Sequence, residues 1–152
     1  MIVLIVDDEA VSRRVLRRLL SRFPQLELHE AGNGQVAWEM LGTTEPALIL
    51  CDLLMPVMDG VTLIRKLREH PVLKSVPVIV TSASKDRDMV LELKDLSLTD
   101  YLLKPFDLVQ TFARLEKHIA PLLRRHLAAK AAEAEAAAAP APVRVFTPPP
   151  TA

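Results

Sequence analysis

The chain has 152 residues, of which 50% are apolar and 25% charged, a balance typical of a globular protein and not of a disordered one. The formal net charge is zero, so no overall positive field favours nucleic acid or an anionic membrane surface. Because the one cysteine allows no internal disulfide and neither a signal segment nor a membrane-spanning run is recognisable, we expect a cytoplasmic protein.

Apolar segments of strand length alternate with helical patterns five times. In chain order we predict a strand at 2–6, a helix beginning at the acids of 7–9, a strand at 26–31, a helix at 35–41, a strand at 47–52, a helix at 61–70, a strand at 78–80, a helix at 86–96, a strand at 101–103 and a helix from 107. The runs at 2–6 and 47–52 lack polar alternation, which indicates burial on both faces, whereas 26–31 alternates as expected nearer an edge.

This alternation predicts an α/β fold. Short connections and crossover helices make the strands parallel, with helices on both faces of the sheet. The expected architecture is a doubly wound five-stranded parallel sheet, a flavodoxin-like (βα)5 fold with strand order 2-1-3-4-5. In that order the first and third strands are neighbours, and ligands bind beyond their carboxyl ends.

Three carboxylates follow these two strands: Asp7 and Asp8 after the first, and Asp52 at the end of the third. They would repel each other without a cation, and an all-oxygen cluster suits Mg²⁺. The competing interpretation is that the acids only cap helices, because acidic groups are favourable in a first helical turn.

The exits of the other strands favour the metal interpretation. The fourth strand ends on the hydroxyls of Thr81 and Ser82, and the fifth ends on Lys104, next to Pro105. Acids, Mg²⁺, a hydroxyl and an ammonium together indicate transfer and holding of a phosphoryl group, chemistry in which charge neutralisation dominates. No glycine-rich phosphate loop occurs, so we do not expect a nucleotide site.

At this point the chain, from Met1 to about Ile119, resembles the receiver domains of two-component response regulators. The resemblance rests on motifs in the family's order: Asp7-Asp8, Asp52 followed by Met55-Pro56 and Asp59-Gly60, Ser82 after 77–80, and Tyr101 three residues before Lys104-Pro105-Phe106. It implies a stand-alone, chemotaxis-regulator-like phosphoacceptor that switches a binding face and is not an enzyme in the usual sense.

The resemblance also implies the roles of individual residues. Asp52 is the phosphoacceptor, and Asp8 and Asp52 bind Mg²⁺ directly, with Asp7 acting largely through water. The backbone carbonyl of Leu54 completes the metal ligands. Lys104 pairs with the phosphoryl oxygens, Ser82 is the switch hydroxyl, and Tyr101 is the aromatic side chain that changes rotamer with it.

The resemblance likewise implies partners. The phosphoryl donor is a sensor histidine kinase or a histidine phosphotransfer protein, and a downstream protein binds the face formed by residues 86–119. Direct contact with nucleic acid or membrane is not expected, and the protein is a monomer or a phosphorylation-dependent dimer. The chain departs from the family's pattern at two positions. Ser82 occupies a position where the family more often has Thr, and Ser97 lies near a position where it often has Gly. These departures bear on the amplitude of the switch and not on its chemistry.

We expect the receiver unit to span residues 1–120. The residues after it are richer in alanine and proline. Pro121 is expected to interrupt the last helix by removing its hydrogen bond to the Lys117 carbonyl. Residues 121–137 form a helical extension rich in alanine, and 138–152 form a Pro/Ala-rich tail that we expect to be disordered. No DNA-reading helix pair is recognisable there.

Two other function classes remain open from the sequence. One is a metal-dependent phosphatase or phosphotransferase acting on small molecules, but that class usually has a second acid two residues after its nucleophile, where this chain has Leu54. The other is a structural adaptor whose extended last helix pairs with itself and whose acidic site is vestigial. The complete set of Asp52, Ser82 and Lys104 argues against such decay.

Overall fold

Five parallel strands form a single sheet in the order β2-β1-β3-β4-β5 in the computed structural model, which describes residues 1–83 and 91–139. The strands are β1 Ile2–Val6, β2 Glu27–Ala31, β3 Leu48–Asp52, β4 Val78–Ser82 and β5 Asp100–Leu103. All four strand pairings are parallel. The predicted doubly wound fold and its strand order are therefore confirmed.

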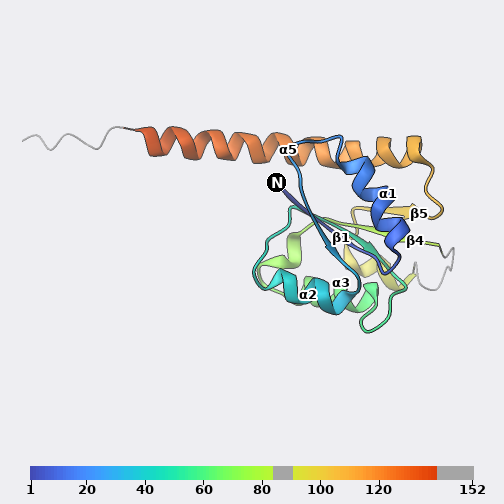
Figure 1. Ribbon diagram of the computed structural model, residues 1–152. Helices are drawn as coiled ribbons and strands as arrows, with labels where there is room; N and C mark the ends of the chain where they lie inside the picture. Colours follow the sequence, from blue (N-terminus) through green and yellow to red (C-terminus); the bar gives the residue numbers. More distant parts are fainter. Residues whose placement is uncertain (84–90, 140–152) are drawn as a thin grey trace, which may run out of the picture.

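Helices cover both faces of the sheet: α1 Ala10–Leu20 and α5 Leu108–Ala138 lie on one face, and α2 Gly34–Leu41 and α3 Gly60–Glu69 lie on the other (Figure 1). Two short 3-10 turns, η1 Leu73–Ser75 and η2 Lys94–Leu96, precede β4 and β5. The helix predicted at 86–96 falls partly outside the described residues. Within them, 91–93 are helical and continue into η2.

The hydrophobic core has two halves because successive strand residues point to opposite faces of the sheet. Leu4 and Val6 of β1 pack on the side of α2 and α3. Val3 and Ile5 of the same strand pack on the side of α1 and α5. Every residue of β3 is buried, as its unbroken apolar run predicts, whereas β2 at the edge has exposed positions.

The last helix is continuous, so the predicted interruption at Pro121 is wrong. Proline removes one backbone hydrogen bond, but Ile119 and Leu123 on either side of it are buried against the body of the domain. The following residues are rich in alanine, the strongest helix former, and they carry α5 well beyond the sheet (Figure 1). None of the described helices combines the length and the apolar character needed to span a membrane.

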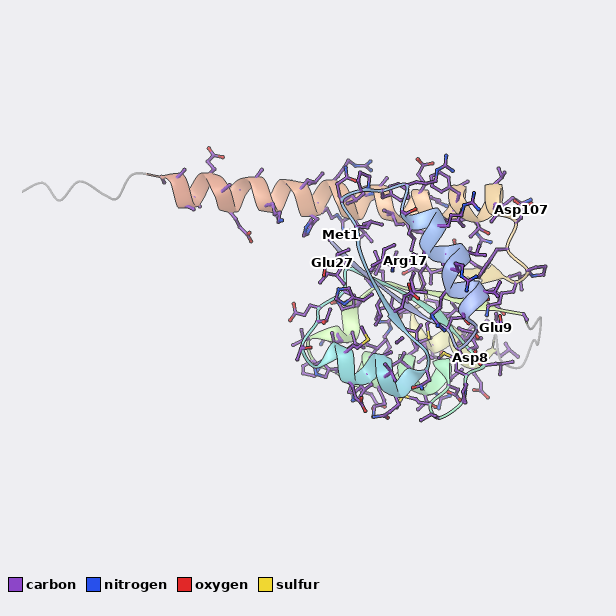
Figure 2. All side chains as sticks on the ribbon, in the orientation of Figure 1. Met1, Asp8, Glu9, Arg17, Glu27 and Asp107 are labelled. Carbon is purple, nitrogen blue, oxygen red and sulfur yellow. The ribbon has the colours of Figure 1, made fainter. Side chains whose placement is uncertain are left out.

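The two ends of the sheet can be told apart by the residues that lie there. Asp8 and Glu9 lie at the end where β1 finishes, whereas Met1 and Glu27 lie at the opposite end, where β1 and β2 begin (Figure 2). The acids after β1 thus lie at the carboxyl edge of a parallel sheet, which is where such folds bind ligands.

Candidate functional site

Asp52 is the last residue of β3, and its side chain is almost completely buried. After the loop that follows β3, the chain passes close to Asp52 again. There the Gly60 amide donates a hydrogen bond to the Leu53 carbonyl at 2.9 Å. A Cβ on Gly60 would lie 2.1 Å from the Asp52 carbonyl oxygen, so only glycine fits there. The preceding Asp59 caps α3 by accepting a hydrogen bond from the Thr62 amide at 2.7 Å. The Asp-Gly pair therefore shapes the loop beside Asp52.

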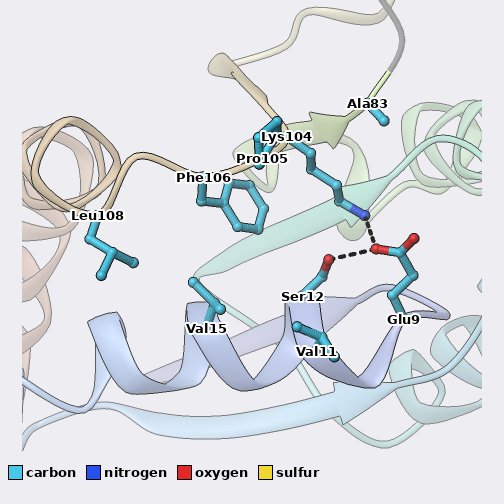
Figure 3. Close-up of a pocket in the computed structure, with 9 residues that line it drawn as sticks. All are labelled: Glu9, Val11, Ser12, Val15, Ala83, Lys104, Pro105, Phe106 and Leu108. Atoms are coloured by element: carbon cyan, nitrogen blue, oxygen red, sulfur yellow. Dashed lines mark hydrogen bonds and ion pairs between the residues drawn. The ribbon is translucent and has the colours of Figure 1, made fainter.

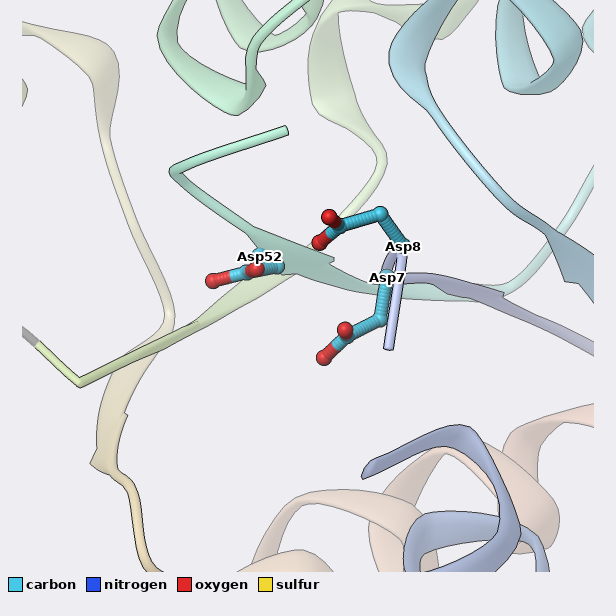
Figure 4. Close-up of side chains that lie close together, drawn as sticks. All are labelled: Asp7, Asp8 and Asp52. Carbon is cyan, nitrogen blue, oxygen red and sulfur yellow. The ribbon is translucent and has the colours of Figure 1, made fainter. Parts of the chain in front are cut away.

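Asp7 and Asp8 directly follow β1, which pairs with β3 so that Val6 lies opposite Cys51. This register brings Asp7, Asp8 and Asp52 together at one edge (Figure 4). One carboxylate oxygen from each lies within 4.8 Å of the others. Asp7 is fully buried and Asp8 is exposed, so the cluster has a protein side and a solvent side.

Lys104, directly after β5, reaches across to the same acids. Its Nζ lies 2.8 Å from Oδ2 of Asp7, 3.3 Å from Oδ2 of Asp52 and 3.4 Å from Oε2 of Glu9. Its side chain is only 10% exposed and Asp7 and Asp52 are buried, so these three charges interact with little screening, whereas Glu9 is 63% exposed. The peptide bond between Lys104 and Pro105 is cis.

The electrostatics of the site follow from burial and from this arrangement. Burial raises the pKa of Asp52, Asp7 adds to the increase, and the positive charge of Lys104 opposes it. Burial by itself would lower the pKa of Lys104, but the carboxylates of Asp7, Asp52 and Glu9 outweigh it and raise that pKa. The pKa of Cys51 is raised strongly by burial, so its thiol stays protonated and is inert, as its place in the strand predicts.

The residues of the cluster fit a divalent cation. Oδ2 of Asp7 is buried and has no hydrogen-bond partner of good geometry among the described residues, although Lys104 lies close to it. The cluster offers only oxygen ligands, which is what a hard cation such as Mg²⁺ requires. The exposed side of Asp8 leaves room for the water molecules that Mg²⁺ retains.

The two hydroxyl-bearing residues that end β4 are both buried. Thr81 lies opposite Asp52 in the sheet, and its Oγ1 has no hydrogen-bond partner among the described residues. Ser82 is the next residue, and its carbonyl accepts a hydrogen bond from the Lys104 amide at 2.9 Å. The ends of β3, β4 and β5 are thereby held together around Asp52.

Two other predicted residues lie near this group without forming part of the acidic cluster. Tyr101 is half-buried on β5 and packs on the α2–α3 side of the sheet, so it lies beside the site and not in it. Leu54 is in the loop after β3, and 56% of its surface is exposed.

Glu9 is a site residue whose contact with Lys104 was not predicted from the sequence, which suggested only a helix cap. Its Oε2 accepts a hydrogen bond from the Ser12 hydroxyl at 2.8 Å, and this bond with the charge of Lys104 lowers the pKa of Glu9 (Figure 3). The three-residue spacing of Glu9 and Ser12 at a helix start signals their local hydrogen bond, but nothing in the sequence signals the contact with Lys104. Beside them is a hollow of about 410 Å³ between α1 and the start of α5, with Val11, Val15, Phe106 and Leu108 among its lining residues.

Comparison with known proteins gives a consistent match. A family model described as the response regulator receiver domain matches residues 3–116. The transcriptional regulatory protein SrrA of Staphylococcus aureus is 40% identical over 123 residues, which are 81% of this chain and 48% of SrrA. The chain therefore spans about half the length of the curated relatives it matches.

Solved structures agree with the sequence comparison. The signal receiver domain of a signal transduction histidine kinase from Syntrophus aciditrophicus superposes with a TM-score of 0.69 at 32% identity, covering 81% of this chain and 89% of that one. The Mn²⁺-bound form of response regulator Rcp1 superposes with a TM-score of 0.67 at 27% identity, covering 76% and 89%.

Proposed function

Because this chain belongs to the response regulator receiver domain family, whose members are signalling switches, we propose that it accepts a phosphoryl group on Asp52. The donor is the phosphohistidine of a sensor histidine kinase or of a histidine phosphotransfer protein. The observation that carries the assignment is the position of Lys104, whose ammonium lies 3.3 Å from Asp52 and 2.8 Å from Asp7. A fixed positive charge beside Asp52 would neutralise the negative charge of the arriving phosphoryl oxygens, which supports the proposal.

The transfer is a substitution at phosphorus. A carboxylate oxygen of Asp52 forms a new bond to phosphorus while the bond from phosphorus to the histidine nitrogen breaks, and the imidazole released from the donor keeps the bonding electrons and is protonated from solvent. The product is an acyl phosphate. Lys104 holds the negative charge on the phosphoryl oxygens during the transfer, and Asp7 keeps Lys104 in place and charged.

The cofactor that suits this site is Mg²⁺. Asp7, Asp8 and Asp52 would hold it, with the backbone carbonyl of Leu54 as a further ligand. When bound, Mg²⁺ neutralises charge on the phosphoryl group and on the three acids. The Mn²⁺-bound structure of the similar regulator Rcp1 supports a divalent cation in this family.

A hollow beside the site supports docking of the phosphoryl donor. It opens next to Lys104, and its rim includes Val11 and Leu108, which are 69% and 54% exposed. Apolar side chains that line one hollow together, as these do with Val15 and Phe106, favour the binding of another protein. We assign this hollow to the protein that carries the phosphohistidine.

The output of the switch is a change in a second surface. Ser82 moves toward the phosphoryl group and Tyr101 changes rotamer with it, which alters the face at 86–119 for a downstream protein. Of that face the described part is 91–119, where Leu91, Leu103 and Val109 are exposed apolar residues. A change from monomer to dimer on phosphorylation stays a prediction, as do the boundaries of the receiver unit at 1–120, the helical extension at 121–137 and the tail at 138–152.

A small-molecule phosphatase or phosphotransferase is less well supported. That class usually needs an acid at the position of Leu54, and here that position, two residues after Asp52, has an exposed apolar side chain. The family's role as a signalling switch favours transfer between proteins.

The proposal is tested by incubating the full chain with acetyl phosphate and Mg²⁺ and measuring the mass of the intact protein by mass spectrometry. The parent should gain one phosphoryl group, and Asp52→Asn should gain none because an amide is a poor nucleophile. Asp59→Asn is the matched control, since Asp59 is a nearby acid whose role as a helix cap asparagine can replace. Equal labelling of the parent and of Asp52→Asn would overturn the assignment of the acceptor.

A further inference from the structure

Arg68, on the last turn of α3, makes an unusual set of contacts far from the acidic site. Its Nε donates to the Leu96 carbonyl at 2.7 Å, and its Nη2 donates to the Ser97 carbonyl at 3.2 Å. Its Nη1 donates to the carbonyls of Lys74 and Val76 at 3.1 Å and 2.9 Å. One guanidinium therefore binds four backbone carbonyls from two segments that are not adjacent in sequence.

The two segments lead directly into β4 and β5. Lys74 and Val76 lie in and just after η1, and β4 begins at Val78. Leu96 ends η2, and β5 begins at Asp100. Hydrogen bonding between β4 and β5 begins at these starting ends, where the Thr99 amide donates to the Val78 carbonyl at 2.8 Å. Arg68 thus ties the starting ends of both strands to α3.

The turn that Arg68 holds has an unfavourable backbone conformation. Ser97 has φ 51° and ψ 56°, the left-handed region that residues other than glycine rarely adopt. A turn of this kind persists where the surroundings determine it, and the carbonyls of Ser97 and its predecessor are both bound by Arg68. Arginine suits the task because its five donors form a rigid fork, whereas lysine donates from a single point.

The far ends of the same two strands carry Ser82 and Lys104, whereas Tyr101 is the second residue of β5 and lies close to the end that Arg68 holds. Ser82 ends β4, and β5 leads to Lys104. A strand that is fixed at its start cannot absorb a change at Lys104 by slipping or by unwinding the turn at Ser97. Such a change then has to appear in the side chains of Tyr101 and Ser82.

We infer that Arg68 is a positioning residue of the switch: by binding the carbonyls before β4 and β5 it fixes the starts of these strands, and it thereby couples the state of Asp52 to the face around Tyr101. The coupling part of this inference rests on the proposed function. The anchoring part does not, because it concerns the protein before phosphorylation. The two parts are therefore measured separately.

The test compares the full-length parent with Arg68→Met, Arg68→Lys and the control Arg65→Met. Arg65 lies on the same helix, but it is exposed, and within the described residues its ion pair is with the exposed Glu92. In the unphosphorylated Arg68 variants we expect hydrogen exchange at the amides of 99–102 to accelerate about tenfold, while exchange in β1 changes by less than about twofold. Phosphoryl uptake from acetyl phosphate should stay within about threefold of the parent.

The second measurement adds beryllium fluoride and Mg²⁺ as a phosphoryl mimic. In the parent and in Arg65→Met the mimic should alter exchange around Tyr101, and in both Arg68 variants that response should fall by about half or more. Acceleration spread equally over β1 and β5 would show that Arg68 serves only global stability, and a parent-like Arg68→Lys would show that its fork geometry is irrelevant. A full response in Arg68→Met would likewise overturn the coupling. Failure of the parent to respond would reject the proposed function while leaving the anchoring result valid.

Discussion

The Nζ atom of Lys104 lies 2.8 Å from Oδ2 of Asp7, so the residue after β5 is paired with the residue after β1 across the end of β3. Asp7 is fully buried, and among the described residues Lys104 supplies the positive charge that pairs with its Oδ2. Such a pair is costly to break, because removal of one partner leaves the other charge buried and uncompensated.

Replacing Lys104 with methionine should therefore destabilise the protein in metal-free buffer. We expect the free energy of unfolding to fall by about 2 kcal/mol, less than for a fully enclosed pair because the site opens to solvent at Asp8. Addition of Mg²⁺ should restore part of the loss by supplying positive charge. Urea unfolding with and without Mg²⁺ measures both effects, with Lys74→Met as an exposed control. Equal losses in the two variants would contradict a structural role for the Lys104 ion pair.

Replacing Asp8 with asparagine tests the metal site with little structural disturbance, because Asp8 is exposed. In metal-free buffer the variant should be at least as stable as the parent, since one repelling charge is removed. At a Mg²⁺ concentration about ten times the dissociation constant, the parent should gain about 1.4 kcal/mol of stability, and Asp8→Asn should lose most of that gain. The exposed acid Glu45, changed to glutamine, is the control. A clear loss of apo stability in Asp8→Ala that Asp8→Asn does not share would show that the acid is a helix cap, because asparagine can replace aspartate in that role.

Replacing Ser82 with alanine should separate phosphorylation from output. The Asp52 carboxylate and Lys104 remain, so phosphoryl uptake should change by no more than about threefold. The amide chemical shifts that a phosphoryl mimic induces across 91–119 should largely disappear, because the hydroxyl that moves toward the phosphate is missing. Thr81→Val is the matched control, since it removes a neighbouring hydroxyl that has no hydrogen-bond partner among the described residues. Unchanged shifts in Ser82→Ala would mean that the signal leaves Asp52 by another route.

The raised pKa of Asp52 gives a stability effect with a defined sign. Because burial holds the folded-state pKa above the ordinary value, ionised Asp52 opposes folding at neutral pH, and this cost disappears as pH falls through the folded pKa toward about 3.9. Asp52→Asn carries no such charge, so in metal-free buffer it should be more stable than the parent at pH 7. Thermal unfolding between pH 7 and pH 4 should show that advantage shrinking, and an advantage independent of pH would refute this origin.

The ionised carboxylate of Asp100 should stabilise the folded protein, which is the opposite of the effect expected for Asp52. Burial would raise its pKa, but hydrogen bonds from His118 Nε2 at 2.9 Å, from the Tyr101 amide at 2.8 Å and from Arg114 outweigh it, so the pKa of Asp100 is lowered. Its stabilising contribution is present above the ordinary pKa of about 3.9 and is lost as pH falls through the lower folded pKa. Asp100→Asn should cost about 1.5 kcal/mol at pH 7, at the low end for charged hydrogen bonds because Arg114 is half-exposed. The same unfolding series should show this difference from the parent vanishing at low pH.

The sequence by itself determined the class of fold and the residues at its carboxyl edge. Unbroken apolar runs identify strands such as β3 that are buried on both faces, and parallel connectivity brings their ends together, so Asp7, Asp8 and Asp52 could be grouped without coordinates. The motifs around Lys104 and Ser82 then pointed to one family. These inferences succeed because periodicity and strand order are properties of local patterns and of chain connectivity.

Other features depended on which distant residues meet, and only the tertiary structure decided them. Pro121 predicted a break in the last helix, but packing of Ile119 and Leu123 on either side keeps α5 continuous. The contact between Lys104 and Glu9 and the four carbonyls bound by Arg68 join segments far apart in sequence. No periodic pattern records such contacts, because they arise from the direction and reach of side chains after the sheet and its helices have packed.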